Sequence, residues 1–337
     1  ALAKVRDENG WHVVVTDTFA NPNLARRLEI SRTSPKALSL YVSIENRSDN
    51  VAANTEPAAN DVNSDDLLPK QKPTNSALKP TMPRTQTYRA PAKINWFLHI
   101  TGKRVDGYHI LETVFQKIDW FDELRIRPNE TGLILLQGDL SGVAIEHNLA
   151  HRAASALKAY AQTQGKDTGH LGAEIHLRKN IPTGAGLGGG SSNAATVLTA
   201  LNQLWQLHFD NVTLQTIGLQ LGADVPFFVS PHPSAYAQGI GEQLSPIELP
   251  ARELLLIKPN VHADTREVYQ HPLLVRDHVP LDMGASALSE QLKILNARTT
   301  LSNDMQAAAF AIAPKIKRVH DTLQHLVPHT YVRMSGS

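Results

Sequence analysis

The sequence predicts an α+β protein built from two domains. Its 337 residues, 42% of them hydrophobic, are enough for about two domains with cores of their own. Strand-like and helix-like patterns mix along the chain without the regular spacing of βαβ units, which favours an α+β arrangement. A glycine-dense loop at 184–190 leads directly into an amphipathic helix. This junction is the strongest local signal in the chain.

Strands are predicted before the glycine loop. Apolar patterns indicate strands at 92–100, 111–119 and 122–127, with a turn at Asp106-Gly107 between the first two. Residues 173–178 alternate apolar and polar side chains. This alternation is typical of a half-exposed, antiparallel strand rather than a buried parallel one.

Helices are predicted on both sides of the loop. Residues 148–162 and 191–205 carry apolar side chains at helical spacing. A third helix is expected at 214–221, ending at Gly222, a residue that suits a helix C-terminus. In the remaining C-terminal part we expect strands to alternate with helices.

The first 87 residues differ from the rest. Residues 1–45 contain short strand-like runs at 11–15 and 38–44, too few strands for a stable sheet alone. Residues 46–87 are poor in large apolar side chains and rich in polar residues and proline, so we expect a disordered linker. The order of residues within 1–45, with Gly10-Trp11 and Leu38-Ser39-Leu40, resembles the C-terminal end of the bacterial outer-membrane lipoprotein insertion factor. An unrelated extension is the alternative.

Composition narrows the functional class. A formal net charge of +1 gives no reason to expect nucleic acid as a partner. The chain has no cysteine, so neither disulfides nor a lipid-anchoring cysteine are expected. No run approaches the roughly 18 apolar residues of a membrane helix, and no signal peptide is apparent. We expect a cytoplasmic enzyme, monomeric or homodimeric, without a membrane partner.

The glycine loop is expected to bind phosphate. Five glycines in seven residues let the backbone turn tightly and bring its N–H groups against an anion. The helix that follows presents its N-terminal dipole to the same point. A G-x-G-x-x-G dinucleotide motif fits poorly after a half-exposed strand, and Gly190 stands where a Walker loop needs lysine. A flexible glycine turn that binds no ligand is the alternative interpretation.

Residues 182–195, Pro-Thr-Gly-Ala-Gly-Leu-Gly-Gly-Gly-Ser-Ser-Asn-Ala-Ala, resemble the ATP loop of the GHMP small-molecule kinases. The resemblance extends in collinear order over about 88–337. It implies an ATP-binding domain of the ribosomal protein S5 domain 2-like type at 88–242 and a ferredoxin-like α/β domain at 243–337. In that family a sequence like 333–337 opens a second glycine motif followed by further elements, so we expect the second domain to be incomplete.

Two more segments narrow the resemblance. Residues 90–98 with Gly107-Tyr108-His109, and residues 221–228, are similar to GHMP kinases that act on 4-diphosphocytidyl-2-C-methyl-D-erythritol. The resemblance implies ATP- and Mg²⁺-dependent phosphorylation of its 2-hydroxyl in the non-mevalonate isoprenoid pathway. It also implies an ATP site formed by Pro182, Thr183, Gly184, Ala185, Gly186, Leu187, Gly188, Gly189, Gly190, Ser191 and Ser192. The hydroxyls of Ser191 and Ser192 would reach phosphate or Mg²⁺.

Asp224 and Lys93 are the candidate catalytic residues. A hydroxyl nucleophile reacts faster when a base takes its proton, and Asp224 follows a predicted helix end in the family's aspartate segment. Lys93 would keep this carboxylate ionised and stabilise the developing alkoxide. A turn-capping aspartate and a solvated strand lysine are the alternatives from local sequence alone.

Substrate-binding residues follow from the resemblance. Tyr108 corresponds to an aromatic residue that stacks on cytosine, His109 to a residue that hydrogen-bonds its edge, and Tyr269 to the opposing aromatic. Asn95 would contact the polyol. Each of these side chains would otherwise be interpreted as packing.

Other functions stay open. A different GHMP kinase would phosphorylate another alcohol, and an inactive nucleotide-binding fragment would result from an incomplete second domain. His147 and His151 have the i, i+4 spacing of metal ligands, but Asn148 occupies the glutamate position of H-E-x-x-H and no third ligand is evident. We therefore expect no metal held by protein ligands alone.

Overall fold

The computed structural model describes residues 2–6, 12–16, 85–140, 142–250, 254–294, 300–326 and 331–336. The predicted strand at 38–44 and nearly all of the predicted linker at 46–87 lie outside these residues. Gln86 and Thr87, the last two linker residues, are instead the first residues of a strand.

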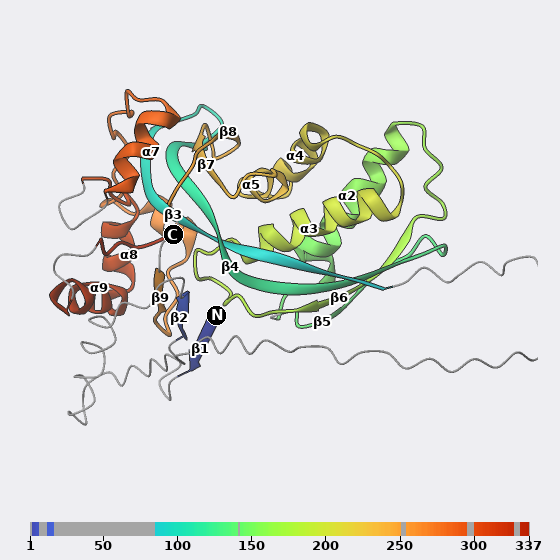
Figure 1. Ribbon diagram of the computed structural model, residues 1–337, viewed down its shortest axis with the longest axis horizontal. Helices are drawn as coiled ribbons and strands as arrows, with labels where there is room; N and C mark the ends of the chain where they lie inside the picture. The colour runs from blue at the N-terminus through green and yellow to red at the C-terminus, as the bar shows by residue number, and fades with distance from the viewer. Residues whose placement is uncertain are drawn as a thin grey trace, which may run out of the picture.

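A six-stranded sheet forms the centre of the molecule (Figure 1). Its path runs β5-β6-β4-β7-β8, and β3 pairs with β4. The six strands are β3 (Gln86–Lys103), β4 (His109–Asn129), β5 (Ile134–Gly138), β6 (Gly172–Arg178), β7 (Ser234–Gln238) and β8 (Gln243–Pro246). β7 and β8 pair across the expected domain boundary at 242/243.

β4 replaces two strands that the sequence predicted separately. Residues 111–119 and 122–127 lie in one strand, and the register against β3 shifts between Pro91 and Ala92. Pro91 pairs with Phe121 and Ala92 with Ile118, which leaves Asp119 and Trp120 without a partner in β3. Such a bulge interrupts the apolar alternation while the strand continues, so the pattern looked like two strands.

β6 was predicted as a half-exposed antiparallel strand. It pairs antiparallel with β4, as expected, and also parallel with β5 on its other side. Its side chains alternate between buried and more exposed along the strand, because one face of the sheet carries helices.

Helices α2 to α5 cover one face of this sheet (Figure 1). The predicted helices at 148–162, 191–205 and 214–221 are confirmed with shifted ends. The described elements are η2 (Ile145–His147), α2 (Leu149–Thr163), α3 (Gly189–Leu204), α4 (Asn211–Leu219) and α5 (Val225–Val229). α5 was not predicted, because five consecutive apolar residues carry no helical periodicity.

The main core lies between this sheet and these helices. Leu124 and Ile126 of β4 pack with Leu157 of α2 and with Leu198 and Leu201 of α3, and all five side chains are fully buried. Burial of this apolar face holds α3, and therefore the glycine loop before it, against the sheet.

The C-terminal part differs from the expected alternation of strands and helices. After β9 (Leu254–Lys258), the elements in the described ranges are helices: α6 (Thr265–Gln270), α7 (Ala285–Lys293), α8 (Gln306–Ile312) and α9 (Pro314–Leu326). Ala308 and Ala309 of α8, with Met305 just before it, share one buried hydrophobic cluster with Leu98 and Ile100 of β3. The secondary structure of this region therefore depends on packing between segments that are distant in the sequence.

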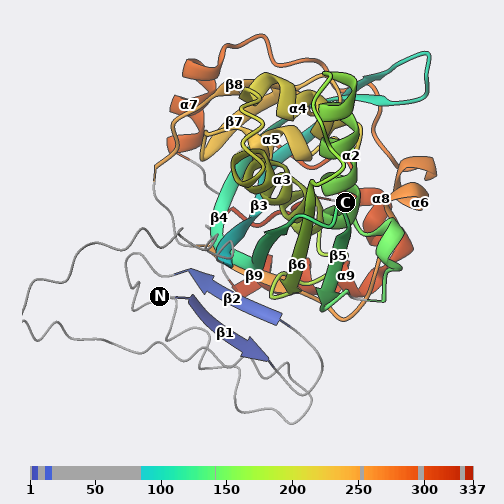
Figure 2. The same ribbon diagram turned by 90° about the vertical axis from the view of Figure 1, so that its right-hand side faces the viewer.

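The N-terminal residues supply a separate hairpin. β1 (Leu2–Arg6) and β2 (His12–Thr16) pair antiparallel, and β2 pairs antiparallel with β9. The three strands make a second sheet beside the main one (Figure 2). β1 was not predicted, β2 corresponds to the strand-like run predicted at 11–15, and β9 supplies the third strand of this sheet. Across the described ranges, no helix is both long and apolar enough to cross a bilayer.

Candidate active site

Lys93 and Asp224 meet beside the glycine loop, as the sequence predicted. The Lys93 Nζ atom lies 3.5 Å from Asp224 Oδ2 and donates a hydrogen bond of 2.7 Å to Asn95 Oδ1. The Lys93 side chain is 6% exposed and that of Asp224 is 31% exposed. A buried ammonium needs such partners to remain charged, whereas the partly exposed carboxylate remains accessible to a ligand.

The fold fixes both members of this pair. Lys93 lies on β3, where its backbone N–H donates to Leu187 O of the glycine loop at 3.0 Å and its Nζ lies over the Phe115 ring at 4.9 Å. Asp224 occupies the N-cap position of α5. A turn from Gly222 O to Val225 N, 3.0 Å long, sets the direction of the chain at this carboxylate.

Asn95 connects the pair to the rest of the sheet. Its Nδ2 donates to Thr113 Oγ1 of β4 at 2.8 Å, and the Thr113 hydroxyl donates to Phe97 O. The chain of bonds orients the Asn95 amide so that its oxygen faces Lys93. Thr113 was not predicted at the site, and a lone threonine in a strand gives no sequence signal for this role.

The glycine loop takes a backbone conformation that other residues rarely adopt. Gly184, Gly186 and Gly188 have φ of 65°, 69° and 68°, in the left-handed region that glycine tolerates. Gly188 is the N-cap of α3. No backbone N–H from residues 183 to 191 has an acceptor within the described part of the chain. These unused donors at a helix N-terminus are the arrangement that binds phosphate.

Neighbouring groups approach the same glycines closely. A Cβ on Gly188 would lie 2.8 Å from Phe228 Cε2, and one on Gly186 would lie 2.5 Å from Ser335 O. A Cβ on Gly184 would lie 2.8 Å from His262 Nδ1. The loop therefore needs glycine for packing as well as for conformation. His262 was not predicted at the site, because it belongs to no recognisable motif. Only its position seven residues before Tyr269 relates it to a predicted residue.

The two serines after the loop differ in environment. Ser192 is fully buried and its Oγ has no hydrogen-bond partner in the described structure. Ser191 is half-buried, with its Oγ near Gly222, in the turn before Asp224. Both hydroxyls therefore lie near the start of α3, and Ser191 is close to the turn that carries Asp224.

The predicted aromatic pair is arranged differently from the expectation. The His109 ring stacks on Tyr269, with centroids 4.7 Å apart and an interplanar angle of 16°. Tyr108 is 59% exposed, and its backbone closes the turn at Arg104 through a 2.7 Å bond. The structure therefore brings His109, rather than Tyr108, against Tyr269. Side-chain rotation at an exposed turn is not encoded in a local pattern.

Burial and nearby charges shift the pKa values of two residues in this aromatic cluster. Burial, with the nearby cations Lys103 and Arg276, lowers the pKa of His109, and its Nε2 is buried without a hydrogen-bond partner among the described residues. Burial and the Asp224 carboxylate raise the pKa of Tyr269 to about 12. At neutral pH both rings are uncharged, and this suits them to stack on and hydrogen-bond an uncharged base.

Lys117 stabilises the other end of α5. It pairs with Lys93 across β3 and β4, and its Nζ donates to Ser230 O at 2.7 Å and lies 5.2 Å from the Phe227 ring centre. A cation at a helix C-terminus interacts favourably with the last carbonyls. The two neighbouring lysines thus contact opposite ends of the short helix that begins at Asp224.

The shifted pKa of Lys117 leads us to predict that the free energy of unfolding depends on pH. Burial lowers its pKa from 10.5 to about 8, so between these values the unfolded chain binds more protons and the free energy of unfolding rises with pH. Lys117→Met removes this contribution. We expect the free energy of unfolding of the wild type, minus that of the variant, to increase from pH 7 to pH 10 in urea titrations. A constant difference over this range would contradict the shift.

Metal ligation by protein side chains alone finds no support in the described ranges. No group of three or more histidine, aspartate or glutamate side chains there is arranged to hold a metal ion.

Known proteins share this architecture. The model of the GHMP kinases N terminal domain matches residues 148–231, which include the glycine loop and Asp224. The 4-diphosphocytidyl-2-C-methyl-D-erythritol kinase of Polynucleobacter necessarius subsp. necessarius (strain STIR1) is 44% identical over 249 residues, 74% of this chain and 79% of that protein. The enzyme of the same description from Burkholderia mallei (strain SAVP1) is 43% identical over 248 residues, 74% of this chain and 81% of its own.

A solved structure agrees with these relatives. The crystal structure of a 4-(cytidine 5'-diphospho)-2C-methyl-D-erythritol kinase superposes with a TM-score of 0.58 at 35% identity, covering 74% of this chain and 87% of that one. The predicted α+β GHMP kinase fold is thereby confirmed. Because relatives at 43–44% identity cover 74% of the chain, and the family model includes the glycine loop and Asp224, the chain is a kinase that belongs to the 4-diphosphocytidyl-2-C-methyl-D-erythritol kinases of the GHMP family.

Proposed function

We propose that this protein transfers the γ-phosphoryl group of ATP to the 2-hydroxyl of 4-diphosphocytidyl-2-C-methyl-D-erythritol. The products are the 2-phosphate and ADP, in the non-mevalonate route to isoprenoid precursors. The observation that carries the proposal is the Lys93–Asp224 pair, 3.5 Å apart, beside a glycine loop with unused N–H donors. Membership of the family supplies the choice of alcohol.

Asp224 is the proposed general base. Its carboxylate takes the proton of the 2-hydroxyl while the hydroxyl oxygen forms a bond to the γ-phosphorus and the bond to the ADP oxygen breaks. The neighbouring Lys93 ammonium stabilises negative charge on the attacking oxygen. Asn95 holds Lys93 in position through its 2.7 Å hydrogen bond, and in our proposal its remaining polar edge contacts the polyol.

The glycine loop is the proposed ATP site. The N–H groups of 183–191, together with the N-terminus of α3, would bind the ATP phosphates. The buried, unpartnered Ser192 hydroxyl and the neighbouring Ser191 fit Mg²⁺ bound to those phosphates. When bound, Mg²⁺ neutralises phosphate charge during transfer. The protein's own contribution is to fix the phosphates in line with the hydroxyl near Asp224.

The cytidine end would bind at the aromatic cluster. Tyr269 offers a face for stacking, worth about 1–3 kcal/mol by analogy with base stacking, and the free Nε2 of His109 offers a hydrogen bond to the base edge. Insertion of cytosine requires the His109 and Tyr269 rings to separate, because they now contact each other. Tyr108, exposed on the adjacent turn, is free to rotate and cover the other face.

An ADP-release assay tests the substrate. We expect turnover with diphosphocytidyl methylerythritol and at least a hundredfold lower kcat/KM with methylerythritol phosphate, which lacks cytidine. In Tyr269→Leu, we expect KM for the cytidine substrate to rise about tenfold, the equivalent of one lost stacking contact, with KM for ATP unchanged. Equal turnover of the two alcohols would contradict the substrate assignment and indicate another GHMP kinase activity.

A further inference from the structure

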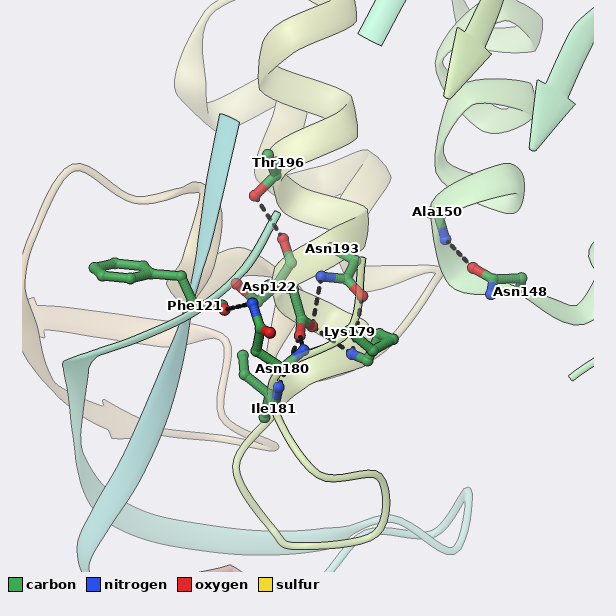
Figure 3. Close-up of polar contacts among 10 residues, drawn as sticks. Phe121, Asp122, Asn148, Ala150, Lys179, Asn180, Ile181, Asn193 and Thr196 are labelled. Carbon is green, nitrogen blue, oxygen red and sulfur yellow. Dashed lines mark hydrogen bonds and ion pairs between the residues drawn. The ribbon is translucent and has the colours of Figure 1, made fainter. Parts of the chain in front are cut away.

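Asp122 is a fully buried carboxylate whose partners all come from the two ends of the glycine loop (Figure 3). Its Oδ1 accepts backbone hydrogen bonds from Asn180 N at 2.7 Å and Ile181 N at 2.8 Å. Its Oδ2 accepts from Asn193 Nδ2 at 2.9 Å and from Lys179 Nζ. Lys179 Nζ also donates to Asn193 Oδ1 at 3.1 Å, which closes the network.

The bulge in β4 lies just before this residue, with only Phe121 between them. Asp119 and Trp120 are unpaired against β3, and Asp122 pairs with Ala90 just beyond the register shift. A bulge reorients the side chains that follow it, and here it accompanies a carboxylate that is buried next to the glycine loop. Burial of an unpaired charge is strongly unfavourable, so the carboxylate requires all of these donors.

The partners have a specific place in the chain. Lys179, Asn180 and Ile181 connect β6 to the loop, and Asn193 lies in the first turns of α3, directly after it. Asp122 therefore joins the residues that precede the loop to those that follow it. The loop between them is held to β3 through Leu187 O, which accepts from Lys93 N, but no N–H of residues 183–191 finds an acceptor in the described structure.

We propose that Asp122 is a positioning residue for the phosphate loop. By holding 179–181 against Asn193, its carboxylate fixes the distance between the two loop ends. The loop N–H groups can then keep their orientation without hydrogen bonds of their own. This inference rests on the proposed binding of ATP at the loop, and it is independent of the choice of alcohol. Both carboxylate oxygens of Asp122 are occupied by donors of this chain, so Asp122 acts through those residues rather than on the nucleotide.

The variant Asp122→Asn tests the proposal. It preserves the size of the side chain but removes the negative charge that binds Lys179, and it replaces one acceptor by a donor. We expect KM for ATP to rise at least tenfold while KM for the alcohol changes less than twofold. We also expect the ADP-induced rise in Tm, measured at an ADP concentration that saturates the wild type, to be largely lost.

Glu112→Gln is the matched control. Glu112 is a second buried carboxylate on β4, and it accepts from Tyr236 OH at 2.9 Å, Gln238 Nε2 at 3.2 Å and Leu281 N at 2.8 Å, all outside the loop. This variant should lose stability and keep the wild-type KM for ATP. If Asp122→Asn also loses only stability, with an unchanged KM for ATP and an unchanged ADP shift, the proposal is wrong.

Asn193→Ala is a second variant, to be used if Asp122→Asn does not fold. It removes only the bonds on the α3 side, because both ends of the Asn193 amide are bonded within the network, to Asp122 and to Lys179. We expect a smaller rise in KM for ATP, about threefold, and an unchanged KM would count against the proposal. The ADP shift needs no alcohol: its loss in Asp122→Asn upholds the proposal even if the wild type fails to turn over the cytidine substrate.

Discussion

Asp224→Asn is expected to lower kcat by about 10²- to 10⁴-fold, the usual contribution of a general base. The amide has almost the same shape as the carboxylate but does not accept the proton of the attacking hydroxyl. KM for ATP should stay within about twofold, because the loop donors that would bind phosphate lie on other residues. Steady-state kinetics with ADP detection would measure both values, and ADP binding would confirm that the nucleotide site is intact.

Asp210→Asn is the control for this substitution. Asp210 caps α4 by accepting a 2.8 Å bond from Thr213 N, and asparagine caps helices about as well as aspartate. Both variants remove one carboxylate at the start of a helix, yet only Asp224 lies beside Lys93. Asp210→Asn should therefore retain wild-type kcat. Wild-type turnover by Asp224→Asn would eliminate the general-base role.

Gly188→Ala is expected to have the largest effect on the loop. At φ 68° an alanine costs roughly 1–2 kcal/mol. Its Cβ would also lie 2.8 Å from Phe228 Cε2 and 3.1 Å from Lys93 Cγ. Phe228 is 9% exposed, so the clash adds about 1–3 kcal/mol of overpacking. We expect both a lower free energy of unfolding and, because Lys93 is displaced, a more than tenfold loss of kcat.

Gly165→Ala separates the two causes. Gly165 has nearly the same φ, 72°, but a Cβ there would meet nothing within 4 Å. It should show the conformational cost alone, about 1–2 kcal/mol in urea unfolding, with wild-type kinetics. Equal losses of stability in the two variants, with kcat retained in Gly188→Ala, would mean that close packing at the loop has no part in placing Lys93.

Local features of the sequence were sufficient for most elements near the site. Helical spacing located α2, α3 and α4, because a long amphipathic helix repeats its apolar face. The glycines of 184–190 predicted a tight loop before a helix, and the structure shows that Gly184, Gly186 and Gly188 have left-handed backbone there. α5 escaped prediction, since its helical state depends on contacts with Lys117 and Phe115 rather than on its own pattern.

The sequence by itself predicted a glycine loop suited to phosphate, the family and the candidate residues Lys93 and Asp224, because these depend on residue types at fixed short spacing. Only the tertiary structure decided that Asp122 joins the ends of the loop, that Thr113 orients Asn95, and that His109 rather than Tyr108 contacts Tyr269. Each of these contacts joins segments far apart in the chain or depends on a rotamer. Strand register, a bulge and side-chain packing set them, and no local pattern encodes those features.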